Sequence, residues 1–195
     1  MRSKFDEQLA LLNRDLTKMG SLCEEALALA AKALANADGQ TAAKIAPIDS
    51  EIDQMERTIE SLCLKLLLQQ QPVARDLRQI SAALKMITDM ERIGDQASDI
   101  AEIIITEDKS EIIGFLNGRI GTDAQYICQM AVAAMRMVTE SVEAYVKRDV
   151  AMAEATIQHD DVVDDLFLKV KESLIQMISE NPKDGEYALD LLMIA

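Results

Sequence analysis

Residues 3–36 read SKFDEQLALLNRDLTKMGSLCEEALALAAKALAN, and this stretch decides the fold class. Apolar or small side chains recur along it in alternating steps of four and three residues, which places them on the face of a helix that packs in a bundle. That face comprises Phe5, Leu9, Leu12, Leu16, Met19, Cys23, Ala26, Ala30 and Ala33. The sequence Asp38-Gly39 then predicts the end of the helix.

Two more segments continue the same pattern. The second predicted helix runs from about residue 40 to residue 70 and ends before Pro72, because proline disfavours helical geometry in the residue before it. Its apolar face comprises Ile45, Ile48, Ile52, Met55, Ile59, Leu62 and Leu66. The third predicted helix runs from about residue 73 to residue 106. Three long helices joined by tight turns predict an antiparallel three-helix bundle.

The second half of the chain repeats the first. A shift of 111 residues superimposes Leu16 on Ile127, and the same shift superimposes Asp49 on Asp160. Further pairs under this shift are Met19 and Met130, Leu34 and Tyr145, Asp38 and Asp149, Asp53 and Asp164, and Leu66 and Met177. Pro72 meets Pro182 after the deletion of one residue. An all-α fold of two tandem three-helix bundles explains the length and the repeated turns together.

The repeat also sets the predicted domain organisation. We predict a first bundle over residues 1–107, a linker that contains three glycines over 108–122 and a second bundle over 123–195. Within the second bundle we expect helices over 123–147 and 149–181 and a sixth helix after Pro182.

The last predicted helix is shorter than its counterpart in the first bundle. The repeat places the second copy of Glu91 about six positions beyond Ala195. We therefore expect a second bundle that is truncated at its last helix, with Ile175, Met177 and Leu191 poorly covered.

Bulk composition argues against several classes of function. The formal net charge is -14 at pH 7, so the chain repels nucleic acids and anionic lipid surfaces and favours cations and basic protein surfaces. The three cysteines form no C-x-x-C pair, and the first residues contain no apolar signal core. No apolar run approaches the roughly 20 residues that span a bilayer. We expect a cytoplasmic protein with no nucleic-acid partner and no membrane insertion.

Seven carboxylates are candidate metal ligands, because they form i, i+4 rows in which side chains lie one turn apart on one helix face. These are Asp49 and Asp53, then Glu91, Asp95 and Asp99, and finally Asp160 and Asp164. Like charges at this spacing repel, and a bound cation would offset the repulsion, since carboxylate oxygens are hard ligands for iron, manganese, magnesium or calcium. The alternative is a solvated acidic face, because such spacings also arise by chance in acidic helical chains.

Two arginines lie at the start of the third predicted helix. Arg75 and Arg78 could present their charge to a partner or an anion at the helix N-terminus, where backbone amides favour negative charge. The alternative is a helix start stabilised by i, i+3 charge pairing. Arg92, on the same predicted helix, joins them as a candidate partner-binding residue.

No catalytic constellation is evident. The only histidine is His159, which the repeat superimposes on the apolar Ile48, so we expect a buried core histidine and keep a metal ligand beside Asp160 as the second interpretation. A single histidine gives little basis for a Ser-His-Asp or Cys-His site. No E-x-x-H motif and no glycine-rich phosphate loop occur. We predict that the chain is not an enzyme.

A family resemblance enters at residues 86–97. This stretch, MITDMERIGDQA, contains the sequence E-R-I-G-D and resembles the signature of the PhoU family. Residues 71–80, QPVARDLRQI, resemble the stretch that precedes that signature, and residues 49–53, DSEID, resemble the acidic motif of the family's second helix. Arg2, Phe5, Leu9 and Met19-Gly20 resemble its opening. The likeness covers essentially the whole chain.

The resemblance implies two bundles of like topology in a cytoplasmic accessory protein of the phosphate ABC transporter. It implies negative regulation of phosphate uptake and of the phosphate-starvation response, through contact with a phosphate-sensing histidine kinase and the transporter's ATPase subunit, usually as a homodimer. It also implies multinuclear iron or zinc clusters on acidic motifs, which here are Asp49 and Asp53, Glu91 and Asp95, and Asp160 and Asp164.

Two other classes stay open beside this regulator. One is a metal-dependent enzyme, such as a carboxylate-bridged oxidase or a phosphatase, and the missing E-x-x-H motif argues against it. The other is a metal-binding helical scaffold unrelated to phosphate signalling, and the E-R-I-G-D signature argues against it.

Overall fold

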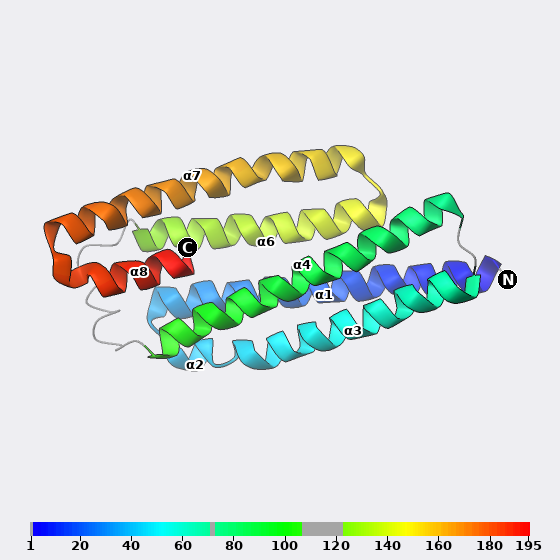
Figure 1. The fold of residues 1–195 in the computed structure, drawn as a ribbon, viewed down its shortest axis with the longest axis horizontal. Helices are drawn as coiled ribbons and strands as arrows, with labels where there is room; N and C mark the ends of the chain where they lie inside the picture. The colour runs from blue at the N-terminus through cyan, green and yellow to red at the C-terminus, as the bar shows by residue number, and fades with distance from the viewer. Residues whose placement is uncertain (1, 71–72, 107–122) are drawn as a thin grey trace.

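The computed structural model describes residues 2–70, 73–106 and 123–195 (Figure 1). Its first unit consists of α1 (Arg2–Asn36), the short α2 (Gly39–Ala42), α3 (Ile45–Gln70) and α4 (Ala74–Thr106). The three long helices pack against one another, and each runs antiparallel to the one that precedes it. They form the predicted three-helix bundle, and none of the described residues is in a strand.

The second unit repeats this arrangement with a shorter last helix. It consists of α6 (Asp123–Lys147), α7 (Val150–Glu180), a 3₁₀ turn (Pro182–Asp184) and α8 (Gly185–Ile194). α6 packs against α7, and it also packs against α1, which joins the two units. α8 folds back on α7 and contacts α4. With 10 residues against the 33 of its counterpart α4, α8 lies along only part of the α6–α7 pair.

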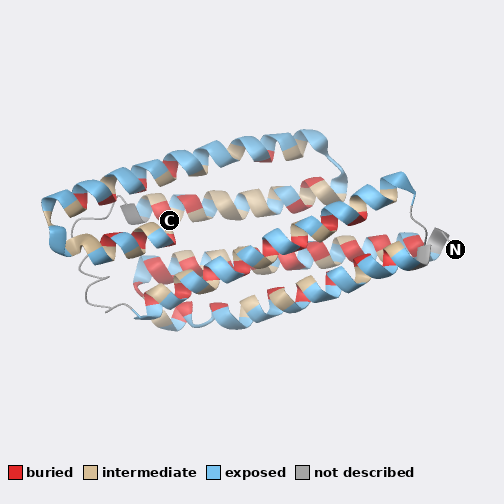
Figure 2. Ribbon diagram, in the orientation of Figure 1, coloured by how far each residue is buried: buried red, intermediate tan, exposed pale blue. Residues whose placement is uncertain are grey.

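The core lies along α1. The predicted apolar face of this helix is fully or nearly fully buried, and Leu12, Leu16 and Met19 have no exposed surface. In Figure 2 the buried positions face the interior of each bundle, while most of α7 is exposed. The prediction that Met177 and Leu191 are poorly covered is wrong, since both are buried where α8 packs on α7. Ile175 is exposed, as predicted.

A glycine sets the distance between the two units. A Cβ atom added to Gly20 of α1 would lie 3.1 Å from Val142 Cγ2 of α6 and 3.5 Å from Met90 Cε of α4. A larger residue would push α6 away from α1, so Gly20 allows the close contact between the bundles.

The predicted second helix is two helices in the structure. Pro47 lies in the first turn of α3, where its missing N–H needs no partner, whereas in a continuous helix its ring would clash with the carbonyl of Ala43. The buried face of α3 also drifts from the predicted one. Ile48 and Leu62 are only partly buried, and Cys63 is buried in their place, because the true helix period is 3.6 residues and not 3.5.

The remaining predicted boundaries agree with the structure to within about two residues, which is the usual uncertainty of helix ends. The predicted linker, residues 108–122, lies outside the described residues. In the described ranges, no helix combines the length and the apolar character needed to cross a membrane.

Candidate metal centre

The contact between α3 and α4 brings three predicted carboxylates together. Oxygen atoms of Asp49 and Asp53 on α3 and of Asp95 on α4 all lie within 4.8 Å of one another. Asp49 and Asp53 are partly buried, and Asp95 is exposed, so the group opens to solvent on one side. The i, i+4 aspartates of α3 therefore face the aspartate of the E-R-I-G-D sequence on α4.

Gly94 determines how closely these two helices approach. A Cβ atom at this position would lie 2.7 Å from Asp49 Oδ1 and 3.1 Å from Ile52 Cδ1. Asp49 Oδ1 is buried and has no hydrogen-bond partner, while the hydroxyl of Ser98 donates to Asp49 Oδ2 at 3.0 Å. Gly94, the glycine of the E-R-I-G-D sequence, thus leaves space for the Asp49 carboxylate against the backbone of α4.

The surroundings of two of these carboxylates, Asp49 and Glu91, disfavour their ionised forms. Burial raises the pKa of Asp49, the Ser98 hydrogen bond lowers it, and the charge of Asp95 raises it again. Burial also raises the pKa of Glu91, followed by the charges of Asp95 and Glu56. Negative charge is therefore crowded between α3 and α4. Among the described ion pairs only Arg57 offsets it, by donating to Asp53 Oδ2 at 2.9 Å.

A metal ion fits these residues. Metal–oxygen distances of about 2.0–2.6 Å allow oxygens up to about 5 Å apart to share one ion, and the three carboxylates satisfy this spacing. The buried Oδ1 of Asp49 has no hydrogen-bond partner, so it is an acceptor that a bound cation would satisfy. The other two predicted ligands on α4 lie near the same group. The charge of Asp99 raises the pKa of Asp49, and the charge of Asp49 raises the pKa of Glu91.

The second predicted acidic pair is in a different environment. Asp160 and Asp164 on α7 are both exposed, and among the described residues no third metal-ligating side chain joins them in a comparable group.

The three predicted partner-binding arginines lie in two places. Arg75 and Arg78 line a groove between α4, α6 and α7, whereas Arg92 is exposed elsewhere on α4, where its only ion pair is with Asp89 at 4.0 Å in the part of the chain that the structure describes. The pairing expected for a plain helix start does not involve Arg75 or Arg78, since the described ion pairs within 4.0 Å include neither.

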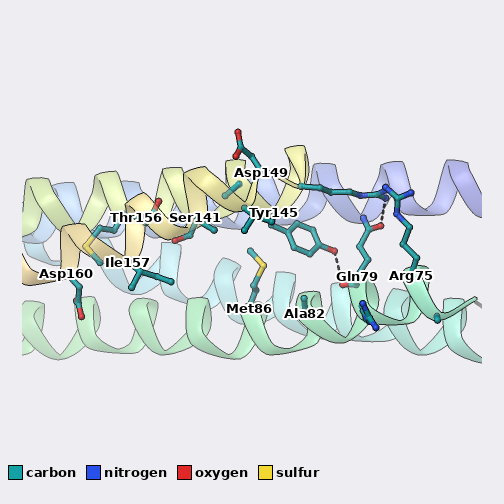
Figure 3. A pocket seen from close by; sticks show the side chains of 17 residues that line it. Arg75, Gln79, Ala82, Met86, Ser141, Tyr145, Asp149, Thr156, Ile157 and Asp160 are labelled. Atoms are coloured by element: carbon teal, nitrogen blue, oxygen red, sulfur yellow. Dashed lines mark hydrogen bonds between the residues drawn. The ribbon is translucent and has the colours of Figure 1, made fainter.

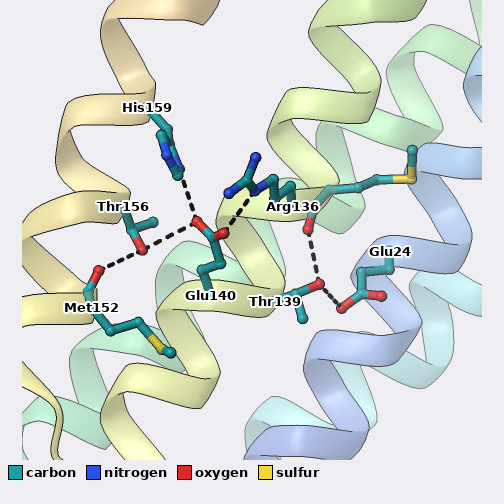
Figure 4. Close-up of polar contacts among 8 residues, drawn as sticks. Glu24, Arg136, Thr139, Glu140, Met152, Thr156 and His159 are labelled. Atoms are coloured by element: carbon teal, nitrogen blue, oxygen red, sulfur yellow. Dashed lines mark hydrogen bonds and ion pairs between the residues drawn. The ribbon is translucent and has the colours of Figure 1, made fainter.

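His159 is not a core histidine. Its side chain is 33% exposed, and Nδ1 lies 2.8 Å from Oε2 of Glu140 on α6 (Figure 4). Arg136 donates to the other oxygen of Glu140 at 2.7 Å, and the hydroxyl of Thr156 also lies within hydrogen-bond distance of Oε2. The His159 side chain therefore lies at the edge of the α6–α7 contact, where it pairs with the Glu140 carboxylate.

The cysteines offer no nucleophile. Burial raises the pKa of Cys23 to about 12 and the pKa of Cys63 to about 11, so both thiols stay protonated at neutral pH. Burial also raises the pKa of Cys128.

Sequence reasoning missed several members of these sites. Glu56 and Ser98 contribute to the acidic group, and Glu140 and Arg148 make contacts between helices. Glu56 lies three residues after Asp53 and seven after Asp49, so the helical period alone places it on the same face. The other three depend on which helices meet, and nothing local in the sequence marks them.

Fold and site together define a class: an acidic, repeated helical-bundle protein with a carboxylate group between two helices of its first unit. The chain belongs to the PhoU family, because the family model described as PhoU domain matches both units, over residues 16–104 and 127–195.

Relatives and solved structures agree with this assignment. The chain is 35% identical over 182 residues to the "Phosphate-specific transport system accessory protein PhoU homolog" of Clostridium acetobutylicum, an alignment that covers 92% of this chain and 79% of the relative. It is 32% identical over 192 residues to the homolog of Pseudomonas aeruginosa, which covers 97% and 75%. These relatives are named as accessory proteins and not as enzymes.

The fold likeness is close over the whole length. The crystal structure of PhoU from Pseudomonas aeruginosa matches with a TM-score of 0.86 and 29% identity, covering 97% of this chain and 88% of that one. The regulatory protein PhoU from Streptococcus pneumoniae matches with a TM-score of 0.81 over 97% and 89%, and at 23% identity it supports the fold alone.

Proposed function

We propose that this chain regulates phosphate uptake and phosphate-starvation signalling by protein contact in the cytoplasm, and not by catalysis. The main support is that the PhoU domain model covers both helical units. Relatives that are 30–35% identical carry the name of a phosphate-specific transport system accessory protein, which supports the same system for this chain.

The proposed partners are a phosphate-sensing histidine kinase and the ATPase subunit of the phosphate ABC transporter, with the chain acting as a homodimer. The net charge of -14 favours basic surfaces on those partners, because charge complementarity raises association rates and selects partners. Contacts through exposed acidic faces weaken as salt is added, since the Debye length falls from about 10 Å at 0.1 M to 3 Å at 1 M.

A genetic experiment tests the regulatory assignment. The gene is deleted in its host, the cells are grown in ample phosphate, and a promoter of the phosphate-starvation response is followed. Derepression that is reversed by the reintroduced gene supports negative regulation. A silent promoter together with unchanged phosphate uptake contradicts it and leaves a metal-binding scaffold as the better reading.

We also propose that the α3–α4 acidic group binds iron or zinc through Asp49, Asp53 and Asp95, with Glu91 and Asp99 available to a second ion. A bound ion supplies positive charge that offsets the carboxylate repulsion and ties α3 to α4. The support is the mutual spacing of the three carboxylates and the unpartnered buried oxygen of Asp49. We propose a structural or regulatory role for the ion, because the relatives are named as accessory proteins.

Calorimetric titration of the chelator-treated protein with Zn²⁺, Mn²⁺ and Fe³⁺ tests this site. The parent should bind, and the double variant Glu91→Ala, Asp95→Ala should lose binding. The double variant Asp160→Ala, Asp164→Ala is the matched control and should bind like the parent, because those residues lack a third ligand in the described structure. Equal binding by the first variant and the parent excludes the proposed site.

A further inference from the structure

Exposed apolar side chains lie where α3 ends and α4 begins, at the end of the first unit. They are Leu64 and Leu68 on α3, Val73, which directly precedes α4, and Leu77 near its start. Their exposed fractions are 48%, 83%, 64% and 48%. α3 and α4 are antiparallel neighbours, and these ends of the two helices lie at the same end of the bundle (Figure 1). We call these four residues the leucine patch.

The helical period places the leucine patch on the same face of the α3–α4 pair as the acidic group. Leu64 follows Asp53 by 11 residues and Leu77 precedes Asp95 by 18, which are close to three and five full turns. Asp53 and Asp95 face each other across the two helices, with carboxylate oxygens within 4.8 Å. The leucine patch therefore continues the acidic face toward the end of the bundle.

Two glutamates connect the acidic and the apolar parts of this face. Glu56, Glu60, Leu64 and Leu68 follow one another on α3 at intervals of four residues, so each lies one turn from the next. Neither glutamate takes part in a described ion pair within 4.0 Å. From Asp53 to Leu68 the face is about 23 Å long, at 1.5 Å per residue. It is negatively charged at one end and apolar at the other.

The other flank of α4 faces the second unit. There the Tyr145 hydroxyl donates to the backbone carbonyl of Gln79 at 3.0 Å, and Arg148 donates to the side-chain oxygen of Gln79 (Figure 3). Arg75 and Arg78 line the groove on that flank. The leucine patch belongs to the α3 side of the helix, so it is separate from the contact between the two units.

Area and charge together select the occupant of this face. Four partly exposed aliphatic side chains offer on the order of 200–300 Å² of apolar surface, against about 800 Å² per partner in a stable interface. A stable contact must therefore use the carboxylates as well. A second copy of a chain with net charge -14 brings them no complementary charge, and an anionic lipid surface is repelled. A segment with both basic and apolar side chains matches the two parts.

We propose that the leucine patch and the adjoining Glu56 and Glu60 form a docking site for a helix of a partner protein, apolar at one end and basic at the other. The apolar end covers the leucine patch, as in other contacts between a helix and an apolar helical surface. Lysine or arginine side chains at the other end pair with the two glutamates, and charge complementarity fixes the direction in which the helix binds. This inference rests on the proposed regulation by protein contact and names the surface that makes the contact.

Two synthetic fluorescent peptides of about 18 residues, long enough for a helix of about 27 Å, are the probes. The segregated peptide has leucines in one half and arginines in the other, all on one helix face. The interleaved peptide has the same composition with leucines and arginines alternating along that face. Fluorescence anisotropy with the intact chain in chelator should show at least about tenfold tighter binding of the segregated peptide, because only that peptide places leucines on the leucine patch and arginines on the glutamates.

A triple variant of the leucine patch tests the site. Leu64→Gln, Leu68→Gln, Leu77→Gln leaves the net charge unchanged and should bind the two peptides equally. The matched control changes three apolar residues of the second unit that are 52–58% exposed, and it should keep the preference of the parent; it is Val162→Gln, Ile175→Gln, Leu189→Gln. A separate variant, Glu56→Gln, Glu60→Gln, should bind the segregated peptide more weakly and with less salt dependence.

Complementation in the host separates this inference from the proposed function. In the deletion strain the leucine-patch variant, at the protein level of the parent, should fail to restore repression of the phosphate-starvation promoter, while the control variant should restore it. A deletion strain without derepression and with unchanged phosphate uptake contradicts the proposed function. Derepression that the leucine-patch variant reverses fully contradicts the docking site alone.

Three further outcomes overturn the proposal. The first is the same peptide preference in the leucine-patch variant and the control variant while circular dichroism shows that both are folded. The second is self-association of the parent in sedimentation that the leucine-patch variant loses, which identifies a second copy as the occupant. The third is binding to phosphatidylglycerol vesicles and to neither peptide, which identifies a lipid surface.

Discussion

Ala37 and Arg148 adopt the same left-handed backbone conformation, with φ of 48° and 57°, at equivalent positions of the two units. The amide of Ala37 donates to Leu34 O and that of Arg148 to Tyr145 O, both at 3.2 Å. Each residue directly precedes an aspartate that caps the next helix. A non-glycine residue in this region costs about 1–2 kcal/mol. The repeat therefore extends to backbone geometry, including a strained turn position that neither residue type favours.

The cap that follows the second of these turns should contribute to stability. The Asp149 carboxylate accepts from the Met152 amide at 3.0 Å, and Asp149→Ala should lower the free energy of unfolding by about 1 kcal/mol. Asp161→Ala, an exposed position on the same helix, is the control and should stay within about 0.5 kcal/mol of the parent. Urea unfolding measures both, and an equal effect of the two changes contradicts the capping role.

The close approach of α3 and α4 at Gly94 gives a second prediction. Alanine is favoured over glycine in a helix by about 1 kcal/mol, yet Gly94→Ala should destabilise by about 1–3 kcal/mol through overpacking. The reason is that its Cβ would lie 2.7 Å from Asp49 Oδ1. The same variant should bind metal ions more weakly in calorimetry.

Gly185→Ala is the matched control for this change. No atom lies within 4 Å of a Cβ added at Gly185, so this variant should be neutral or slightly more stable in the same urea experiment. If Gly94→Ala changes the free energy of unfolding no more than Gly185→Ala does, α3 and α4 are not held at the distance that the structure shows.

Asp49 should destabilise the metal-free protein when it is ionised. Burial and the charge of Asp95 raise its pKa in the folded state. The stability linked to its protonation is therefore fully present below the pKa of the unfolded chain, about 3.9. This stability is lost as the pH rises through the pKa of the folded state. Asp49→Asn keeps the acceptor for Ser98 and should raise the melting temperature at pH 7 in chelator. The gain should shrink as the pH falls towards 4.

Two comparisons make this prediction specific. Asp89→Asn changes an exposed carboxylate on α4 and should have little effect on melting. Adding Zn²⁺ should reverse the order, so that the parent becomes more stable than Asp49→Asn, because ligand binding to the folded state raises its stability. A lower melting temperature of Asp49→Asn in chelator at pH 7 speaks against charge crowding at this site.

Glu140 should show the opposite pH dependence. The hydrogen bond from Arg136, and then that from His159, lowers the pKa of Glu140 in the folded state. Its contribution to stability is therefore present above the pKa of the unfolded chain, about 4.3. This contribution is lost as the pH falls through the pKa of the folded state. Glu140→Gln should therefore lower the melting temperature at pH 7, and the difference should vanish in acid. Glu143→Gln, which disrupts only an ion pair within α6, should change melting less.

Sequence by itself determined the helices and their repetition. The steps of four and three along α1, the helix break at Asp38-Gly39 and the stop near Pro72 depend on residues within a few positions of one another. Short-range patterns of this kind fix local structure, because helix periodicity and capping involve only neighbouring turns. The i, i+4 rows were visible for the same reason.

Only the tertiary structure decided which of these residues meet. Asp49 lies against Asp95 because Gly94 lets α3 approach α4, while the equivalent Asp160 faces an open groove. His159 pairs with Glu140, although its position in the repeat predicted burial. Such contacts depend on the rotation, offset and separation of helices, which are set by packing between residues far apart in the chain and leave no periodic trace in the sequence.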